Sequence, residues 1–179
     1  MKSKRALMLI TGLLLSYISC LSQESLNPRP SPTDITKMKH KNTYLKITYS
    51  RPQKNGREIF GNLVPYGKVW RTGANEATEI TLTDTVLVAG DTLNAGTYSI
   101  FSIPQRDKWT VIFNSELGQW GAYNYLEASD VLRIEAPVEK VTDVIWEPFT
   151  IQFEPHNSKA DLIFLWDRTK VKIPIDFLD

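Results

Sequence analysis

Short segments in which apolar and polar residues alternate follow one another through most of the chain after residue 43. The segment TYLKITYS, residues 43–50, places Leu45, Ile47 and Tyr49 on one face. A period of two is typical of a β-strand with one buried face. The later segments are rich in β-branched and aromatic residues and are bounded by Gly, Pro, Asn or Asp. The pattern predicts an all-β fold, a single antiparallel β-sandwich of about nine strands, with barrel-like closure as an alternative.

Two stretches give this prediction detail. ATEITLTDTVLVAGDTL, residues 77–93, predicts two short strands on either side of a tight turn at residues 83–85. AGTYSIFSIP predicts a strand from Gly96 to Pro104, with the hydroxyl of Tyr98 bonded to the backbone at a corner. Strands do not alternate with long helical segments, so a parallel sheet is not expected.

The first residues have the features of an export signal. Lys2, Lys4 and Arg5 precede a short apolar run that ends in small residues, as in a signal peptide over residues 1–22. Cleavage after Ser22 gives a soluble protein, which is the favoured alternative, whereas cleavage before Cys20 gives a lipid-anchored one. We therefore expect an exported protein of the periplasm or cell surface, without a transmembrane helix in the mature chain.

Composition limits the domain organisation and the class of protein that the remaining chain can form. Residues 23–42 contain several prolines among polar residues and predict a flexible tether, which leaves residues 43–179 as one domain. Loss of the three basic residues of the signal changes the formal charge from +1 to −2. A nearly neutral domain has no electrostatic footprint for nucleic acid. Cys20 is the only cysteine, so the mature domain has no disulfide bond to rely on.

The chain resembles a known bacterial family on the motifs YSRP, NGREIFGNLVPYGKVWRTGANEATEI, AGTYSIFSIP, WTVIFN and WGAYNY, which run from residue 49 to residue 125. This is the domain-of-unknown-function family number 2911, and PYGKVWRTGANEAT, residues 65–78, is the most specific motif. The resemblance covers about residues 31 to 175. It implies an exported protein of the Bacteroidota, and it implies no activity, cofactor or catalytic residue.

The motif itself holds the first candidate site. Gly67 and Gly73 permit turns that other residues resist, and Arg71 offers a planar fork of donors that suits a carboxylate or phosphate. Trp70 can act as a flat apolar platform, and Glu76 is an alternative partner for Arg71 inside the chain. A purely structural loop, pinned by an Arg71–Glu76 pair with Trp70 in the core, is the competing interpretation.

The second candidate site is NSELGQWGAYNY, residues 114–125. Aromatic residues beside amides suit stacking on a sugar ring and hydrogen bonding to its hydroxyls. The alternative is a long loop whose aromatic residues cover one end of the core. The predicted ligand-binding residues of both sites are Trp70, Arg71, Asn75, Glu76, Asn114, Trp120 and Tyr123.

Several chemistries are not predicted. His40 and His156 are the only histidines, and neither stands in a pattern typical of a Ser-His-Asp triad or a zinc site. No metal and no cofactor is expected. Carboxylates remain as the means of hydrolysis, with Glu76, Glu79, Asp84 and Glu116 as candidates and Glu76 the first to test.

Three functional hypotheses follow. The first is an exported, non-catalytic module that binds a polar small molecule or a glycan in the cell envelope. The second is a glycosidase-like hydrolase of the periplasm that uses carboxylates. The third is a purely structural envelope protein.

Overall fold

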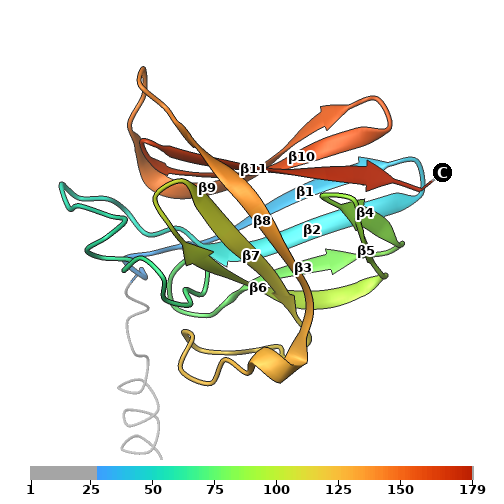
Figure 1. Ribbon diagram of the computed structural model, residues 1–179, viewed down its shortest axis with the longest axis horizontal. Coiled ribbons are helices and arrows are strands. Elements are labelled where there is room, and N and C mark those ends of the chain that lie inside the picture. Colours follow the sequence, from blue (N-terminus) through green and yellow to red (C-terminus); the bar gives the residue numbers. More distant parts are fainter. Residues whose placement is uncertain (1–27, 179) are drawn as a thin grey trace, which may run out of the picture.

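The alternating segments form eleven strands and one short 3-10 helix within residues 28–178, the part of the chain that the computed structural model describes (Figure 1). Neighbouring strands are antiparallel throughout. The predicted all-β, antiparallel fold is confirmed. The elements are β1 (Thr33–His40), β2 (Thr43–Ser50), β3 (Thr78–Leu82), β4 (Val86–Val88), β5 (Asp91–Leu93), β6 (Gly96–Pro104), β7 (Lys108–Asn114), η1 (Glu127–Ser129), β8 (Asp130–Lys140), β9 (Trp146–His156), β10 (Lys159–Asp167) and β11 (Thr169–Phe177).

The strands follow one continuous path in the order β1-β2-β3-β6-β7-β8-β11-β10-β9, and the β4–β5 hairpin attaches to β11. Strand β8 links two layers, because residues 130–137 pair with β7 and residues 138–140 pair with β11. Figure 1 shows β8, in orange, running between them.

The sheet comes close to closing on itself. Strands β1 and β9, the two ends of the path, approach each other. The closing hydrogen bonds are made just beyond β2, where the amide of Phe149 donates to the carbonyl of Pro52 at 2.9 Å. The hydroxyl of Tyr49 also accepts from the amide of Ile151 at 3.0 Å. The architecture is therefore nearly barrel-like, which was the alternative form of the prediction.

A cluster of aromatic rings fills the interior. Trp70 stacks on Trp166 with ring centroids 5.9 Å apart, and it meets Trp109 and Phe149 edge to face. Edge-to-face and offset-stacked pairs are the favoured geometries of aromatic rings. Burial of each large ring contributes roughly 1.5–3 kcal/mol to folding.

The structure corrects the predicted start of the domain. Strand β1 lies inside residues 23–42, for which the sequence predicts a tether, and it pairs with β2 along its whole length. Its signal is weak because Met38 is the only apolar side chain on its partly buried face, beside Asp34 and Thr36. The predicted signal peptide, residues 1–22, and the start of the tether lie outside the described residues.

Other local predictions hold. The hydroxyl of Tyr98 donates to the carbonyl of Asn94 at 3.0 Å, as expected of a tyrosine at a corner. Strands β3 and β4 correspond to the two strands predicted within residues 77–93, and β5 is a further strand there. Between residues 28 and 178, no helix combines the length and apolar character that crossing a membrane requires.

Candidate functional site

The loop that leads into β3 is held rigidly against the sheet. Trp70 exchanges two backbone hydrogen bonds with Ser102 of β6, of 2.7 and 2.8 Å, and the hydroxyls of Thr72 and Ser102 are 2.7 Å apart. A Cβ atom on Gly73 would lie 3.1 Å from the carbonyl oxygen of Ser50. Gly73 therefore serves the close approach of this loop to β2. A site built on this loop is held in place before any ligand arrives.

The loop between β7 and β8 lies directly against the first loop. Glu76 and Trp120 form an isolated antiparallel bridge. Backbone hydrogen bonds of 2.8 and 2.9 Å between their chain neighbours flank the bridge. In such a non-hydrogen-bonded pair the two side chains lie close together on one face. The two candidate sites, predicted separately from the sequence, are thus one continuous surface.

Two aromatic side chains of the second loop are exposed. Trp120 is 57 % exposed and Tyr123 is 85 % exposed. Gly121 has a φ of +71°, and a Cβ atom there would lie 2.7 Å from the ring of Tyr123. The ring can approach the backbone this closely because residue 121 is glycine.

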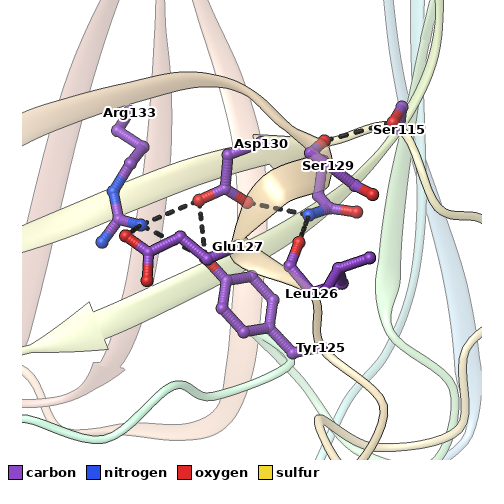
Figure 2. Close-up of polar contacts among 8 residues, drawn as sticks. Ser115, Tyr125, Leu126, Glu127, Ser129, Asp130 and Arg133 are labelled. Atoms are coloured by element: carbon purple, nitrogen blue, oxygen red, sulfur yellow. Dashed lines mark hydrogen bonds and ion pairs between the residues drawn. The ribbon is translucent and has the colours of Figure 1, made fainter.

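A buried carboxylate anchors the base of this loop (Figure 2). Asp130 accepts hydrogen bonds from the amide of Asn114 (2.8 Å), the hydroxyl of Tyr125 (2.6 Å) and the guanidinium of Arg133 (2.8 Å), while its side chain is only 7 % exposed. Burial, together with the hydrogen bond to Asp130, raises the pKa of Tyr125. The phenol therefore stays protonated and acts as a donor. The network fixes both ends of the loop to β7 and β8.

Asn114 belongs to this scaffold and not to a ligand surface, which corrects one predicted site residue. Its side chain is fully buried, its amide nitrogen also donates to the carbonyl of Leu126 (3.0 Å), and its oxygen accepts from the amide of Glu116 (2.9 Å). Both polar atoms of the side chain therefore have hydrogen-bond partners within the chain. Trp70, with 7 % exposure, is likewise a core residue whose edge forms part of a wall.

A hollow of about 280 Å³ opens beside the first loop. Its charged lining residues, among those that the structure describes, are Arg57 and Arg71. Ser31 and Asn75 contribute polar groups, and apolar or small residues including Trp166 form the rest. The amide of Asn75 donates to the carbonyl of Ser31 at 3.1 Å, so the chain just before β1 forms one wall.

Arg71 differs from Arg57 because the described chain supplies neither an ion pair nor a hydrogen bond to its covered Nε atom. Its Nε atom is covered and has no hydrogen-bond partner. Burial lowers the pKa of Arg71, and the nearby phenol of Tyr123 acts weakly in the opposite direction. The covered Nε donor has no partner, and a buried donor without a partner costs free energy in the folded protein.

A second hollow, of about 360 Å³, lies on the other side of the same loop and is lined by Glu76 and Glu79 among others. Glu76 forms a two-pronged ion pair with Arg29, at 2.8 and 2.9 Å, which corrects the expected pairing with Arg71. The Arg29 hydrogen bonds hold the pKa of Glu76 below its usual value. Glu79 accepts from the amide of Gly118 at 2.8 Å.

The structure thus brings together Arg71, Asn75, Glu76, Trp120 and Tyr123. Asn114 is fully buried, and Trp70 is a core residue that lines the hollow. Sequence reasoning missed Arg29, Ser31 and Arg57. Arg29 is far from Glu76 in sequence and carries no motif, whereas Arg57 follows the Asn-Gly turn at residues 55–56, which was a usable signal. Within residues 28–178, no group of three or more His, Cys, Asp or Glu side chains could hold a metal ion.

Comparison with known proteins identifies a family that covers most of the described chain. The family described as "Protein of unknown function (DUF2911)" matches residues 31–175. No match is found among the curated proteins or the solved structures. The matched range begins just before β1 and ends in β11, so it spans nearly the whole sheet and both loops. The chain belongs to the DUF2911 family.

Proposed function

We propose that the protein is an exported, non-catalytic module that binds a polar ligand, such as a glycan of the cell envelope. The observation that carries this proposal is the Glu76–Trp120 bridge, which joins two rigid loops into one surface. That surface combines a hollow containing Arg71 and Asn75 with the exposed rings of Trp120 and Tyr123. Pockets with a few convergent polar groups inside an apolar lining are typical of small-molecule sites.

The arrangement supports recognition of a ring-shaped polar ligand. The hollow offers Arg71 and the serine and asparagine side chains as hydrogen-bonding groups. The exposed aromatic rings offer flat apolar surfaces to such a ligand. Tyr123 acts on the pKa of Arg71, so the aromatic and cationic groups are close to each other.

A carboxylate-based hydrolase is the second candidate, because Glu76 and Glu79 line the same hollow. Such an enzyme needs one carboxylic acid that stays protonated near neutral pH. The hydrogen bonds from Arg29 lower the pKa of Glu76, which suits a base or nucleophile and not the acid. Glu79 accepts a backbone hydrogen bond in a partly exposed setting. Glu76 is therefore unsuited to the role of the acid, and the binding module ranks first.

A thermal-shift and calorimetric screen against neutral and acidic mono- and oligosaccharides tests the proposal. We expect binding to at least one saccharide, and we expect Tyr123→Ala to weaken it without changing the melting temperature, because the side chain is 85 % exposed. Turnover of aryl glycosides that disappears in Glu76→Gln would favour the hydrolase. The absence of any ligand, together with an Arg71→Ala variant that only loses stability, would favour a purely structural protein.

A further inference from the structure

The lining of the Arg71 hollow, among the described residues, has positive side chains and no negative one. Ion pairs between residues 28 and 178 involve neither Arg57 nor Arg71. Two acidic residues that adjoin lining residues in sequence are already engaged, since Glu76 pairs with Arg29 and Asp167 pairs with Lys54. Two cationic side chains therefore share one hollow without a counter-charge.

Arg57 is held in a fixed position at the rim. Its Nε atom donates to the carbonyl of Lys54 at 2.9 Å, and one terminal nitrogen donates to the carbonyl of Gln53. Carbonyl oxygens orient a guanidinium but leave its full positive charge in place. Arg57 thus contributes an oriented charge.

Arg71 is available for an incoming group. Its covered Nε atom faces protein without a partner, and the two terminal Nη atoms make no hydrogen bond within the described chain. The carbonyl oxygen of the Gln119 side chain, in the adjoining loop, is also covered and unpartnered. Buried polar groups without partners are rare in native proteins, and two of them lie in the two loops that meet at this surface.

We propose that the ligand of this hollow carries an oxyanion, a carboxylate or a phosphate ester, which the terminal Nη atoms of Arg71 bind end-on while Arg57 supports it from the rim. The inference rests on the proposed binding function and specifies its ligand class as an acidic saccharide. Two parallel hydrogen bonds from one guanidinium match the geometry of a carboxylate or phosphate. A neutral ligand would leave the charge of Arg71 unbalanced.

The size of the hollow defines how much of the ligand enters. Its volume of about 280 Å³ is at or below the roughly 300–1,000 Å³ of sites that enclose a drug-sized ligand. One charged terminal sugar therefore fits inside. The exposed ring of Tyr123 is placed to contact the next part of the ligand outside.

Calorimetry and NMR with four probes test the proposal: galacturonate, galactose 6-phosphate, galactose, and acetate. We expect both acidic sugars to bind at least about tenfold more tightly than galactose, because a charge-assisted hydrogen bond commonly contributes that much. Acetate should shift the Arg71 side-chain resonances weakly. Preference for galacturonate over galactose 6-phosphate, or the reverse, identifies the natural oxyanion.

Variants assign the effect to Arg71. Arg71→Gln should reduce binding of the acidic sugars about 10- to 100-fold, to the level of galactose, and leave galactose unaffected. Arg71→Lys keeps the charge but loses the fork of donors. Its affinity for the acidic sugars should therefore lie between that of the native protein and that of Arg71→Gln. Arg106→Gln is the matched control, because Arg106 rests on the ring of Tyr66 and lines a different hollow.

Each failure has its own signature. Equal affinity for galactose and galacturonate, or an equal loss of both in Arg71→Gln, overturns the oxyanion and leaves the binding module intact. Shifts with acetate that depend on Arg71, without binding of any sugar, support the oxyanion and overturn the saccharide. If no probe binds and the native protein shows no shift with acetate, the proposal is wrong.

Discussion

Asp130 is a buried carboxylate and Arg71 is a partly buried guanidinium, and the chain treats the two charges in opposite ways. Asp130 receives hydrogen bonds from Asn114, Tyr125 and Arg133. Arg71 donates no hydrogen bond to the described residues and forms no ion pair with them, and burial lowers its pKa. The partners of the carboxylate make it a stabilising part of the fold, whereas the covered nitrogen of the guanidinium destabilises it.

This difference underlies the proposal that Asp130 is a structural residue and Arg71 a ligand-binding one. A buried charge that has all its partners rigidifies the fold, whereas a buried charge without partners destabilises it unless a ligand completes the site. Natural proteins commonly retain such destabilising groups where function requires them. The predictions below test each side of the comparison.

The largest effect is expected for Asp130→Asn. The amide cannot accept from three donors and turns its own NH2 group toward one of them, so the free energy of unfolding should fall by about 3 kcal/mol. Urea denaturation measures the loss. Glu127→Gln is the matched control, because Glu127 bonds the same Arg133 but its side chain is 77 % exposed, and its change should stay within about 0.5 kcal/mol. Equal losses in both variants would show that burial does not distinguish the two carboxylates.

An intermediate effect is expected at high pH for Tyr49, a second buried group with its partners inside the chain. Burial raises the pKa of Tyr49 from 10.0 to about 12. The folded state therefore holds this proton more tightly than the unfolded state, and the stability that follows is complete below pH 10.0 and lost as pH rises toward about 12. The loss amounts to about 2–3 kcal/mol.

Comparison with Tyr49→Phe isolates this proton from the lysines that titrate in the same range. At neutral pH the variant should be less stable by about 1–2 kcal/mol, because the amide of Ile151 loses its acceptor. The difference between the two proteins should shrink and then reverse as pH rises. A constant difference up to about pH 12 would mean that the Tyr49 phenol titrates at its ordinary pKa.

The smallest effect is expected for the exposed pair of Arg29 and Glu76. Arg29→Ala should change stability by less than about 0.5 kcal/mol, because both side chains are near half exposure and solvent screens them. The pKa of Glu76 should rise toward its ordinary value. The small contribution of the pair to the free energy of unfolding is present above the ordinary pKa of Glu76. It is lost as pH falls through the lower pKa of the native protein. An NMR titration of the Glu76 carboxyl checks the shift, and an unchanged pKa would contradict the pair.

The sequence predicted the fold through its alternation, and the structure bears this out wherever one face of a strand is apolar. Strand β1 was missed because neither of its faces is strongly apolar. The turn of the loop around Arg71 could be predicted from its glycines, whereas the ligand-binding role of that loop stays a prediction. The role of Asn114 could not be predicted, because its partner Asp130 is fixed only when β7 and β8 pair. The Arg29–Glu76 pair could not be predicted either, because it depends on the path of the chain before β1.

The unfolding free energy of Arg71→Met, measured without ligand, tests most directly the claim that Arg71 is kept for a ligand and not for the fold. Methionine retains much of the apolar stem and removes the unbalanced charge. We predict a variant at least as stable as the native protein, with a gain of about 0.5–1 kcal/mol. A loss of more than about 1 kcal/mol would contradict the account, because it would show that Arg71 stabilises the loop as an ordinary structural residue.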